Sequence, residues 1–437
     1  MESNTVAIPV SQNERIILLD SLRGFAILGI LLMNIPSMSL PGPVAHDPSL
    51  LNEYGSINYY LWYTVETLFN GTQRALFSML FGAGVFLFTS RLEKRIPGVE
   101  SADYFIRRQL WLMVFSITDV FLLLWNGDIL LDYACIGIVV FVFRKLSPKK
   151  LIICAAVCLL FMTIRENRDF YSDKKIIQRG EAAALIDTSV IKLSVKQQEA
   201  VDAMKQFKNK TSVDGRKKRM QEAIENNTGS YEDLYEFRSN RYLNQLVQYL
   251  YFEIWDVLIF MFLGMAFFKM GVLTGNADIK LYWLLFLAGM GIGVVLSYFR
   301  MQPLIAAQFN WYDYAKTTSF VFFQIDRVAR SLGLFGLLML LYKSGWFKWL
   351  FAVLRPVGQM AFTNYLMQSV FAVFLFYGIG LGLYGQLERY QVYLTLAAIW
   401  VVQIIYSHIW LRHFLYGPFE WAWRSLTYWK KQPFRKK

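Results

Sequence analysis

Charged and amide side chains occur in four short stretches that are otherwise strongly apolar. The first, LLDSLRGFAILGILLMN, contains Asp20 and Arg23, with Asn34 eleven residues after the arginine. The second, NGDILLDYACIG, contains the carboxylates Asp128 and Asp132. Residues three apart on a helix share a face, so Asp20 and Arg23 can pair. Groups of this kind in apolar surroundings could act as a general base and as hydrogen-bond donors in a group-transfer reaction.

The other two stretches lie in the second half of the chain. FQIDRVARSLG contains Asp326, Arg327 and Arg330, and VGQMAFTNYLMQS contains Asn364 and Gln368. Such groups can also join helices by interhelical hydrogen bonds, each contributing about 0.6 to 2 kcal/mol. A charge within hydrocarbon costs a few kcal/mol, so several clusters favour a functional interior. We expect Arg23, Asn34, Arg330 and Asn364 to converge on one chamber open to the cytosol.

The composition indicates that the elements positioning these residues lie in a bilayer. The chain has 437 residues, of which 55% are hydrophobic and only 18% are charged. These values exclude a disordered chain, and three cysteines exclude a disulfide-stapled domain. Despite a net charge of +13, we do not expect a nucleic-acid binder. With only three histidines, and three cysteines that lie within apolar spans, the sequence predicts no metal site.

Apolar segments long enough to cross the membrane predict an all-α, polytopic helical bundle. A crossing helix needs about 20 residues for roughly 30 Å of hydrocarbon. About ten segments meet this criterion. They are 16–37, 74–91, 106–125, 128–144, 149–165, 242–268, 279–299, 319–342, 357–377 and 391–411. A shorter segment, 57–69, is predicted to be an interfacial or re-entrant helix.

The pattern divides the chain into three regions. Residues 1–164 and 242–437 are the two membrane halves, and 165–241 is a polar helical insertion. The insertion is expected outside the cytoplasm, either as a cap over an outer opening or as a flexible, tolerated segment. Asn126-Gly127 predicts a tight turn that fixes Asp128 and Asp132. Glycines such as Gly82 and the GMGIG run at 289–293 would allow close helix packing.

Lysine and arginine are distributed unequally between the two sides of this bundle. The short loops on one side contain only Arg300, Lys316 and Arg389, whereas the other side has many more basic residues. This asymmetry predicts that both termini are cytoplasmic. The densest basic loop on that side contains Arg91, Lys94, Arg95, Arg107 and Arg108.

Five ordered motifs resemble a known family. They are LDSLRGFAILGILLMN, LFSMLFGAG, NGDILLDYACIG, VGQMAFTNYLMQS and WLRHFLYGPFEWAWRSLTY. Together they resemble the YeiB-like family of bacterial inner-membrane proteins. That family is similar to the transmembrane acyltransferases, including heparan-α-glucosaminide N-acetyltransferase. The shared first-helix feature is an Arg-Gly followed by a polar residue eleven positions after the arginine, here Arg23 and Asn34.

The resemblance implies a multi-pass protein of the bacterial cytoplasmic membrane. It would move an acyl group from cytoplasmic acyl-CoA to a hydroxyl or amine at the outer face, on a small-molecule, glycan or lipid acceptor in contact with membrane lipid. The outer-loop histidine of the glucosaminide branch corresponds here to His46, and Asp128 is a second candidate base. The expected substrate contacts are Asp20, Arg23, Asn34, Asp326, Arg327, Arg330, Asn364 and Gln368. The expected phosphate contacts are Arg91, Lys94, Arg95, Arg107 and Arg108.

Two other functions fit the same pattern. A secondary transporter or flippase would use intramembrane ion pairs and glycine-broken helices around a midplane site. A non-catalytic sensor or scaffold would use the 165–241 insertion to bind a partner.

Overall fold

The computed structural model describes residues 16–96, 99–187, 189 and 192–436, and within them the chain is helical. The pairing of Phe414 with Arg435 is an isolated bridge. The helices are α1 Ile17–Ser39, α2 Gly42–Ala45, α3 Ile57–Leu68, α4 Thr72–Arg95, α5 Glu100–Phe121, α6 Leu130–Val142, α7 Pro148–Ala184, α8 Val195–Thr211, α9 Val213–Thr228, α10 Tyr231–Lys269, α11 Ile279–Ala306, α12 Trp311–Thr317, α13 Phe323–Ser344, α14 Lys348–Gln359, α15 Ala361–Phe376, α16 Arg389–His413 and α17 Pro418–Tyr428.

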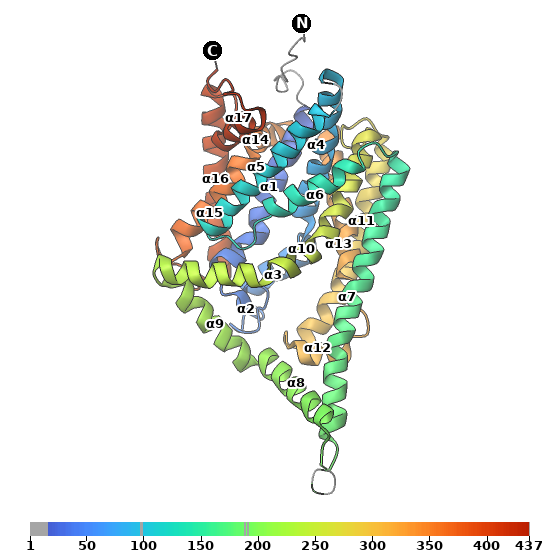
Figure 1. Ribbon diagram of the computed structural model, residues 1–437, viewed down its shortest axis with the longest axis vertical. Helices are drawn as coiled ribbons and strands as arrows, with labels where there is room; N and C mark the ends of the chain where they lie inside the picture. The colour runs from blue at the N-terminus through green and yellow to red at the C-terminus, as the bar shows by residue number, and fades with distance from the viewer. Residues whose placement is uncertain (1–15, 97–98, 188, 190–191, 437) are drawn as a thin grey trace.

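The elongated bundle has two distinct ends. At one end, here named the terminal face, α1 begins and α17 lies beside it (Figure 1). At the opposite end, here named the insertion face, α8, α9 and α12 project beyond the bundle (Figure 1).

Each predicted span except 357–377 overlaps one described helix, which confirms the all-α membrane bundle. By length and apolar composition, four stretches of the described chain could cross a membrane, namely 17–39, 57–95, 279–306 and 389–413. The number rises to six if the bent pairs within 231–269 and 323–359 each count as one span. The remaining predicted spans do not pass this test: α6 and α15, for example, have 13 and 16 residues, fewer than a straight crossing needs.

Three local predictions differ from the structure. Asn126 and Gly127 form a turn as predicted, but they are only part of a longer connection between α5 and α6 that runs from 122 to 129. The predicted span 357–377 is divided at Met360 between α14 and α15. The predicted span 149–165 is part of a longer helix, because α7 runs on from apolar into polar sequence as far as Ala184.

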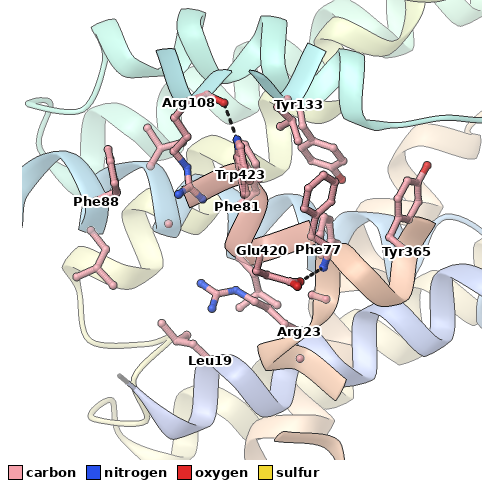
Figure 2. Close-up of a pocket in the computed structure, with 18 of the residues that line it drawn as sticks. Leu19, Arg23, Phe77, Phe81, Phe88, Arg108, Tyr133, Tyr365, Glu420 and Trp423 are labelled. Atoms are coloured by element: carbon pink, nitrogen blue, oxygen red, sulfur yellow. Dashed lines mark hydrogen bonds between the residues drawn. The ribbon is translucent and has the colours of Figure 1, made fainter. Parts of the chain in front are cut away.

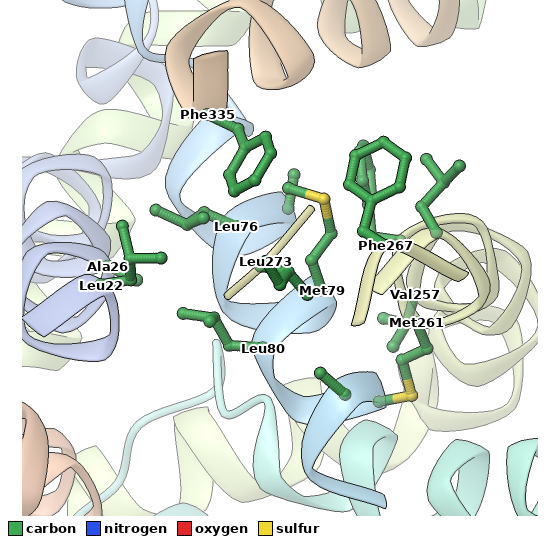
Figure 3. Close-up of a cluster of buried hydrophobic side chains, with 14 of the residues drawn as sticks. Leu22, Ala26, Leu76, Met79, Leu80, Val257, Met261, Phe267, Leu273 and Phe335 are labelled. Carbon is green, nitrogen blue, oxygen red and sulfur yellow. The ribbon is translucent and has the colours of Figure 1, made fainter. Parts of the chain in front are cut away.

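Close helix packing builds the core around α4. Figure 3 shows Leu76, Met79 and Leu80 of α4 between side chains of α1 and α10. A Cβ on Gly82 would lie 2.2 Å from the carbonyl oxygen of Met261, and one on Gly264 would lie 1.9 Å from that of Met79. Only glycine permits backbones to approach this closely. The predicted role of glycines in packing is therefore confirmed for this helix pair.

The polar insertion docks onto the loop that follows α1. It consists of the polar end of α7, then α8, α9 and the start of α10 (Figure 1). Arg216 of α9 is 6% exposed and pairs with Asp47. The same guanidinium donates to the carbonyl of Gln308 at 3.1 Å. The insertion is thus fixed to the loop that contains His46.

Candidate functional site

A cavity of about 260 Å³ lies near the terminal face, between α1, α4, α5, α6, α15 and α17. Arg23, Arg91, Arg108 and Arg424 line it. Figure 2 shows the guanidinium groups of Arg23 and Arg108 directed toward the same space. We call it the terminal-face cavity.

Aromatic packing and hydrogen bonds hold the cavity's charged groups in place. The Arg108 guanidinium lies 3.7 Å from the ring centroid of Trp423, whose indole N–H donates to the Arg108 carbonyl at 2.8 Å. Arg23 donates to Asp20 at 2.9 Å, which confirms the predicted pair. Glu420 accepts from the backbone N–H of Phe362 at 2.7 Å and so caps α15. Both lining carboxylates are therefore engaged, and the lining is basic overall.

The deep part of this cavity is apolar and aromatic. Phe77, Phe81, Tyr133 and Tyr365 line it (Figure 2). The Tyr365 hydroxyl donates to Asp128 at 3.1 Å and accepts from the backbone N–H of Ile129 at 3.0 Å. An interior lined by these side chains suits an uncharged group rather than an ion.

Asp128 lies behind this wall and is 1% exposed. Its carboxylate accepts from the backbone N–H groups of Leu130 at 3.1 Å and Leu131 at 3.3 Å, and from the Ser116 hydroxyl. These contacts cap the N-terminus of α6. Asp128 lines neither cavity. Its contacts support the start of α6, and its catalytic role stays a prediction.

A second cavity, of about 680 Å³, lies toward the insertion face. Its polar lining includes Asn34, Ser37, His46, Asn70 and Arg74. Ile129 also lines it, and Ile129 lines the terminal-face cavity as well. The two cavities therefore meet at one buried residue, 4% exposed, from opposite ends of the bundle. We call the second space the insertion-face cavity.

His46 in this cavity is held by a carboxylate. Its Nδ1 lies 3.1 Å from Oε1 of Glu66, and its Nε2 lies 3.5 Å from the Ser37 hydroxyl. The buried Glu66 also accepts from the Asn70 amide. An ionised carboxylate only accepts hydrogen bonds, so Nδ1 must carry the proton and Nε2 is left as the acceptor. This is the arrangement of a histidine base with an orienting carboxylate.

The environment of His46 raises its affinity for a proton. The side chain of His46 is 57% exposed, so the loss of hydration that lowers its pKa is limited, and the hydrogen bond and the negative charge of Glu66 more than offset it. The pKa of His46 is therefore raised above its ordinary value of 6.5. A stronger base takes a proton from an acceptor more readily, and its conjugate acid can return that proton to a leaving group.

An ion-pair network forms another part of the insertion-face cavity. Arg74 pairs with Glu253 and Asp256, and Asp256 also pairs with Arg327. Arg327 additionally donates to the Gln324 side chain at 2.7 Å. All five residues line the cavity. The network ties α4, α10 and α13 together and gives the cavity a fixed polar surface.

The expected single chamber is not formed. Arg23 lines one cavity and Asn34 the other, and neither Arg330 nor Asn364 lines either of them. The physical reason is that the buried side chain of Ile129 stands between the two cavities, with Arg23 on one side of it and Asn34 on the other, while Arg330 and Asn364 bond to neighbouring helices. The prediction that these four residues share a chamber is therefore wrong.

The other predicted substrate contacts within the bundle hold helices together. Asp326 pairs with Arg330 as predicted, and it accepts from Arg300 at 2.7 Å. Arg330 also donates to the Asn70 carbonyl at 3.2 Å, which supports the turn before α4. Asn364 donates to Ser407 at 3.0 Å, and Gln368 donates to the Ile27 carbonyl at 3.0 Å. Asp326, Arg330, Asn364 and Gln368 line neither cavity and are not included in the site.

The predicted phosphate-binding loop is divided by the fold. Arg91 and Arg108 line the terminal-face cavity, but Lys94, Arg95 and Arg107 do not. Arg107 instead lies 4.1 Å from the Trp429 ring centroid and donates to the Thr427 carbonyl at 3.2 Å. Arg424 of α17, which is far away in sequence, takes a place in the lining. No group of histidine, cysteine, aspartate or glutamate side chains suited to a metal ion occurs among the described residues.

Fold and cavities together define a polytopic helical membrane protein with a polar cavity toward each end. Comparison with known sequences then gives its family. The chain is 31% identical to the uncharacterized protein YxaH of Bacillus subtilis (strain 168), over 98% of both chains. It is 28% identical to the uncharacterized protein YeiB of Escherichia coli (strain K12), over 95% of this chain and 96% of the relative. The chain belongs to the YeiB-like family.

A family model agrees with this assignment. Residues 267–430 match the family described as "Protein of unknown function (DUF418)". No solved structure matches the chain.

Sequence reasoning missed three important residues of the site. Glu66, the partner of His46, lies in the segment 57–69, for which the sequence predicts only an interfacial or re-entrant helix. The other two are Arg424, which lines the terminal-face cavity, and Asp256, which pairs with Arg327. A carboxylate in an otherwise apolar helix, as in INYYLWYTVETLF, was the available signal for Glu66. Arg424 lies among many basic residues near the C-terminus, so no sequence signal separates it from them.

Proposed function

We propose that this protein is a transmembrane acyltransferase. It takes an acyl group from acyl-CoA at the terminal face and transfers it to a hydroxyl or amine in the insertion-face cavity. The observation that carries the proposal is the meeting of the two cavities at Ile129, one with a basic lining and the other with the His46–Glu66 pair. The terminal face is then the cytoplasmic one, as the distribution of basic residues suggests.

The terminal-face cavity has the properties that acyl-CoA requires. The phosphates of the nucleotide are anionic and suit Arg23, Arg91, Arg108 and Arg424. The uncharged pantetheine arm and the acyl chain suit the aromatic depth around Phe77 and Tyr365. An arm that enters along this path brings the thioester toward Ile129.

The insertion-face cavity supplies the groups that acyl transfer needs. Nε2 of His46 takes the proton from the acceptor hydroxyl or amine as the acceptor's oxygen or nitrogen bonds to the thioester carbonyl carbon. A hydrogen-bond donor such as the Asn34 amide stabilises the oxyanion that forms. The carbon–sulfur bond then breaks, and CoA leaves as a thiol with the proton that His46 returns.

The proposal is tested by following label from acetyl-CoA. Membranes containing the protein are incubated with acetyl-labelled acetyl-CoA, and label is measured in the lipid and glycan fractions. We expect transfer with the wild type and a loss of about 10²- to 10⁴-fold in His46→Gln, as for removal of a general base. His413→Gln is the matched control, because His413 is an exposed histidine that lines neither cavity.

Two results would contradict the proposal. One is a purified, folded protein that neither binds acetyl-CoA nor transfers its acetyl group. The other is equal transfer by the wild type and by His46→Gln.

Secondary transport is the second candidate, because two cavities that meet from opposite ends also suit alternating access. The ion-pair network of Arg74, Asp256 and Arg327 would then bind the substrate. Transport predicts counterflow of a substrate that is not chemically changed. Labelled, covalently modified acceptor would exclude transport alone.

A further inference from the structure

A third hollow, separate from the two cavities of the proposed function, lies at the terminal face between the end of α13, α14, the end of α16 and the C-terminal segment. Its volume is about 930 Å³. The basic side chains that line it are Lys343, Lys348, Arg355, Arg412 and Lys436, with His408 beside them. Among the described residues that line it, none is acidic. We call it the basic groove.

Several of these cations have no counter-charge. In the part of the chain that the structure describes, Lys348, Arg355 and Arg412 make neither an ion pair nor a side-chain hydrogen bond. The Nε of Arg355 is buried and has no partner there. Lys343 and Lys436, by contrast, donate to backbone carbonyls, Lys343 to Gly275 at 2.9 Å and Lys436 to Leu411. Like charges gathered at one place repel one another and attract an anion, which would relieve that repulsion.

The surroundings of the groove indicate the source of the anion. Phe351, Pro356, Leu411 and Leu415 contribute apolar lining beside the cations. Trp346 and Trp349, at the junction of α13 and α14, are 85% and 64% exposed. Exposed tryptophans at helix ends are typical of the level of the lipid headgroups. A soluble anion needs neither an apolar lining nor a site at the level of the headgroups. A phospholipid uses both, because its phosphate lies at that level and its acyl chains need apolar contacts.

We propose that the basic groove binds the phosphate of an anionic membrane phospholipid, with the acyl chains along the apolar side. Lys348, Arg355 and Arg412 hold the phosphate, and Lys343 and Lys436 contribute long-range attraction. Gln359 lines both the groove and the terminal-face cavity, so the bound headgroup lies next to the start of the proposed acyl-CoA path.

The test measures lipid binding by the full chain in a neutral detergent. Native mass spectrometry counts bound phosphatidylglycerol, with phosphatidylcholine as the uncharged comparison. We expect phosphatidylglycerol to bind and to raise the unfolding temperature, because a ligand specific to the folded state stabilises it. Each of Lys348→Gln, Arg355→Gln and Arg412→Gln should weaken binding about fivefold.

Two control variants test for a general effect of positive charge, and a soluble anion, adenosine 3′,5′-bisphosphate, tests whether the groove prefers a lipid. Lys94→Gln and Lys150→Gln remove exposed cations that do not line the groove, and they should leave binding unchanged. The proposal is overturned if phosphatidylcholine binds equally well. It is also overturned if the three groove variants bind like the wild type, or if adenosine 3′,5′-bisphosphate occupies the groove and phosphatidylglycerol does not. Acetyl transfer is not a readout here, so failure of this proposal is distinct from failure of the proposed function.

Discussion

A histidine is an effective base when one ring nitrogen is held in place and the other is free to accept a proton. At His46 the carboxylate of Glu66 fixes Nδ1. The Asn70 amide donates to that carboxylate, and Arg330 donates to the backbone carbonyl of Asn70. Arg216 of the insertion anchors Asp47, the next residue in the loop. The base is therefore supported from α3, α9 and α13 at once.

Removing the Glu66 charge changes the pH dependence of the reaction. In Glu66→Gln the carboxylate no longer raises the pKa of His46, so that pKa falls relative to the wild type. The neutral, active base predominates at pH values above its pKa. The acidic limb of the transfer rate in Glu66→Gln should therefore shift to lower pH than in the wild type, with a lower maximum rate. A limb that stays in place or moves to higher pH would show that Glu66 does not act on the base.

Comparing two adjacent arginines, Arg107 and Arg108, distinguishes specific phosphate binding from a general effect of positive charge. Arg108 lines the terminal-face cavity, whereas Arg107 stacks on Trp429 outside it. We expect Arg108→Gln to weaken acetyl-CoA binding by about 1.5 to 3 kcal/mol, the range for hydrogen bonds to charged groups. Arg107→Gln should change affinity little. Calorimetric titration measures both, and equal losses would indicate a non-specific surface effect.

At the scale of the helices, glycines set how closely α11 and α13 approach. A Cβ on Gly289 would lie 2.5 Å from the backbone nitrogen of Gly333 and 2.6 Å from the carbonyl oxygen of Ala329. A Cβ on Gly291, two residues further along the same helix, would meet nothing within 4 Å. These two positions differ in packing but share one helix and one residue type.

This difference predicts opposite effects of the same substitution. Gly289→Ala should lower the free energy of unfolding by about 1 to 3 kcal/mol, because backbone atoms cannot move aside as a side chain would. Gly291→Ala should raise it by about 0.5 to 1 kcal/mol, because alanine favours the helix. Thermal unfolding in detergent measures both. Equal effects would mean that α11 and α13 are not packed at Gly289.

The helices themselves could be predicted from the sequence, because long apolar runs indicate membrane helices. The ends of the helices could not: nothing in the sequence marks the break at Met360 or the continuation of α7 beyond residue 165. Local pairs such as Asp20–Arg23 follow from helical spacing. The pair His46–Glu66 and the placement of Arg424 depend on how separate elements pack, so spacing alone could not reveal them.

At the scale of the whole molecule, the proposed function places acyl-CoA in the terminal-face cavity and the acceptor in the insertion-face cavity. Ile129 lines both and lies next to Asp128, whose contacts fix the start of α6. A large side chain at this junction should close the path without altering either opening. Ile129→Trp is thus expected to retain acetyl-CoA binding and to lose transfer, measured by titration and by label incorporation. Undiminished transfer by a folded Ile129→Trp protein would place the route elsewhere.

The most direct test of the central claim is a density map of the protein with a non-hydrolysable acetyl-CoA analogue. The account predicts the nucleotide phosphates beside Arg23, Arg91, Arg108 and Arg424, and the acyl end near Ile129 on the side of His46. An analogue bound at any other surface, or a terminal-face cavity that is still empty at saturating concentration, would contradict it.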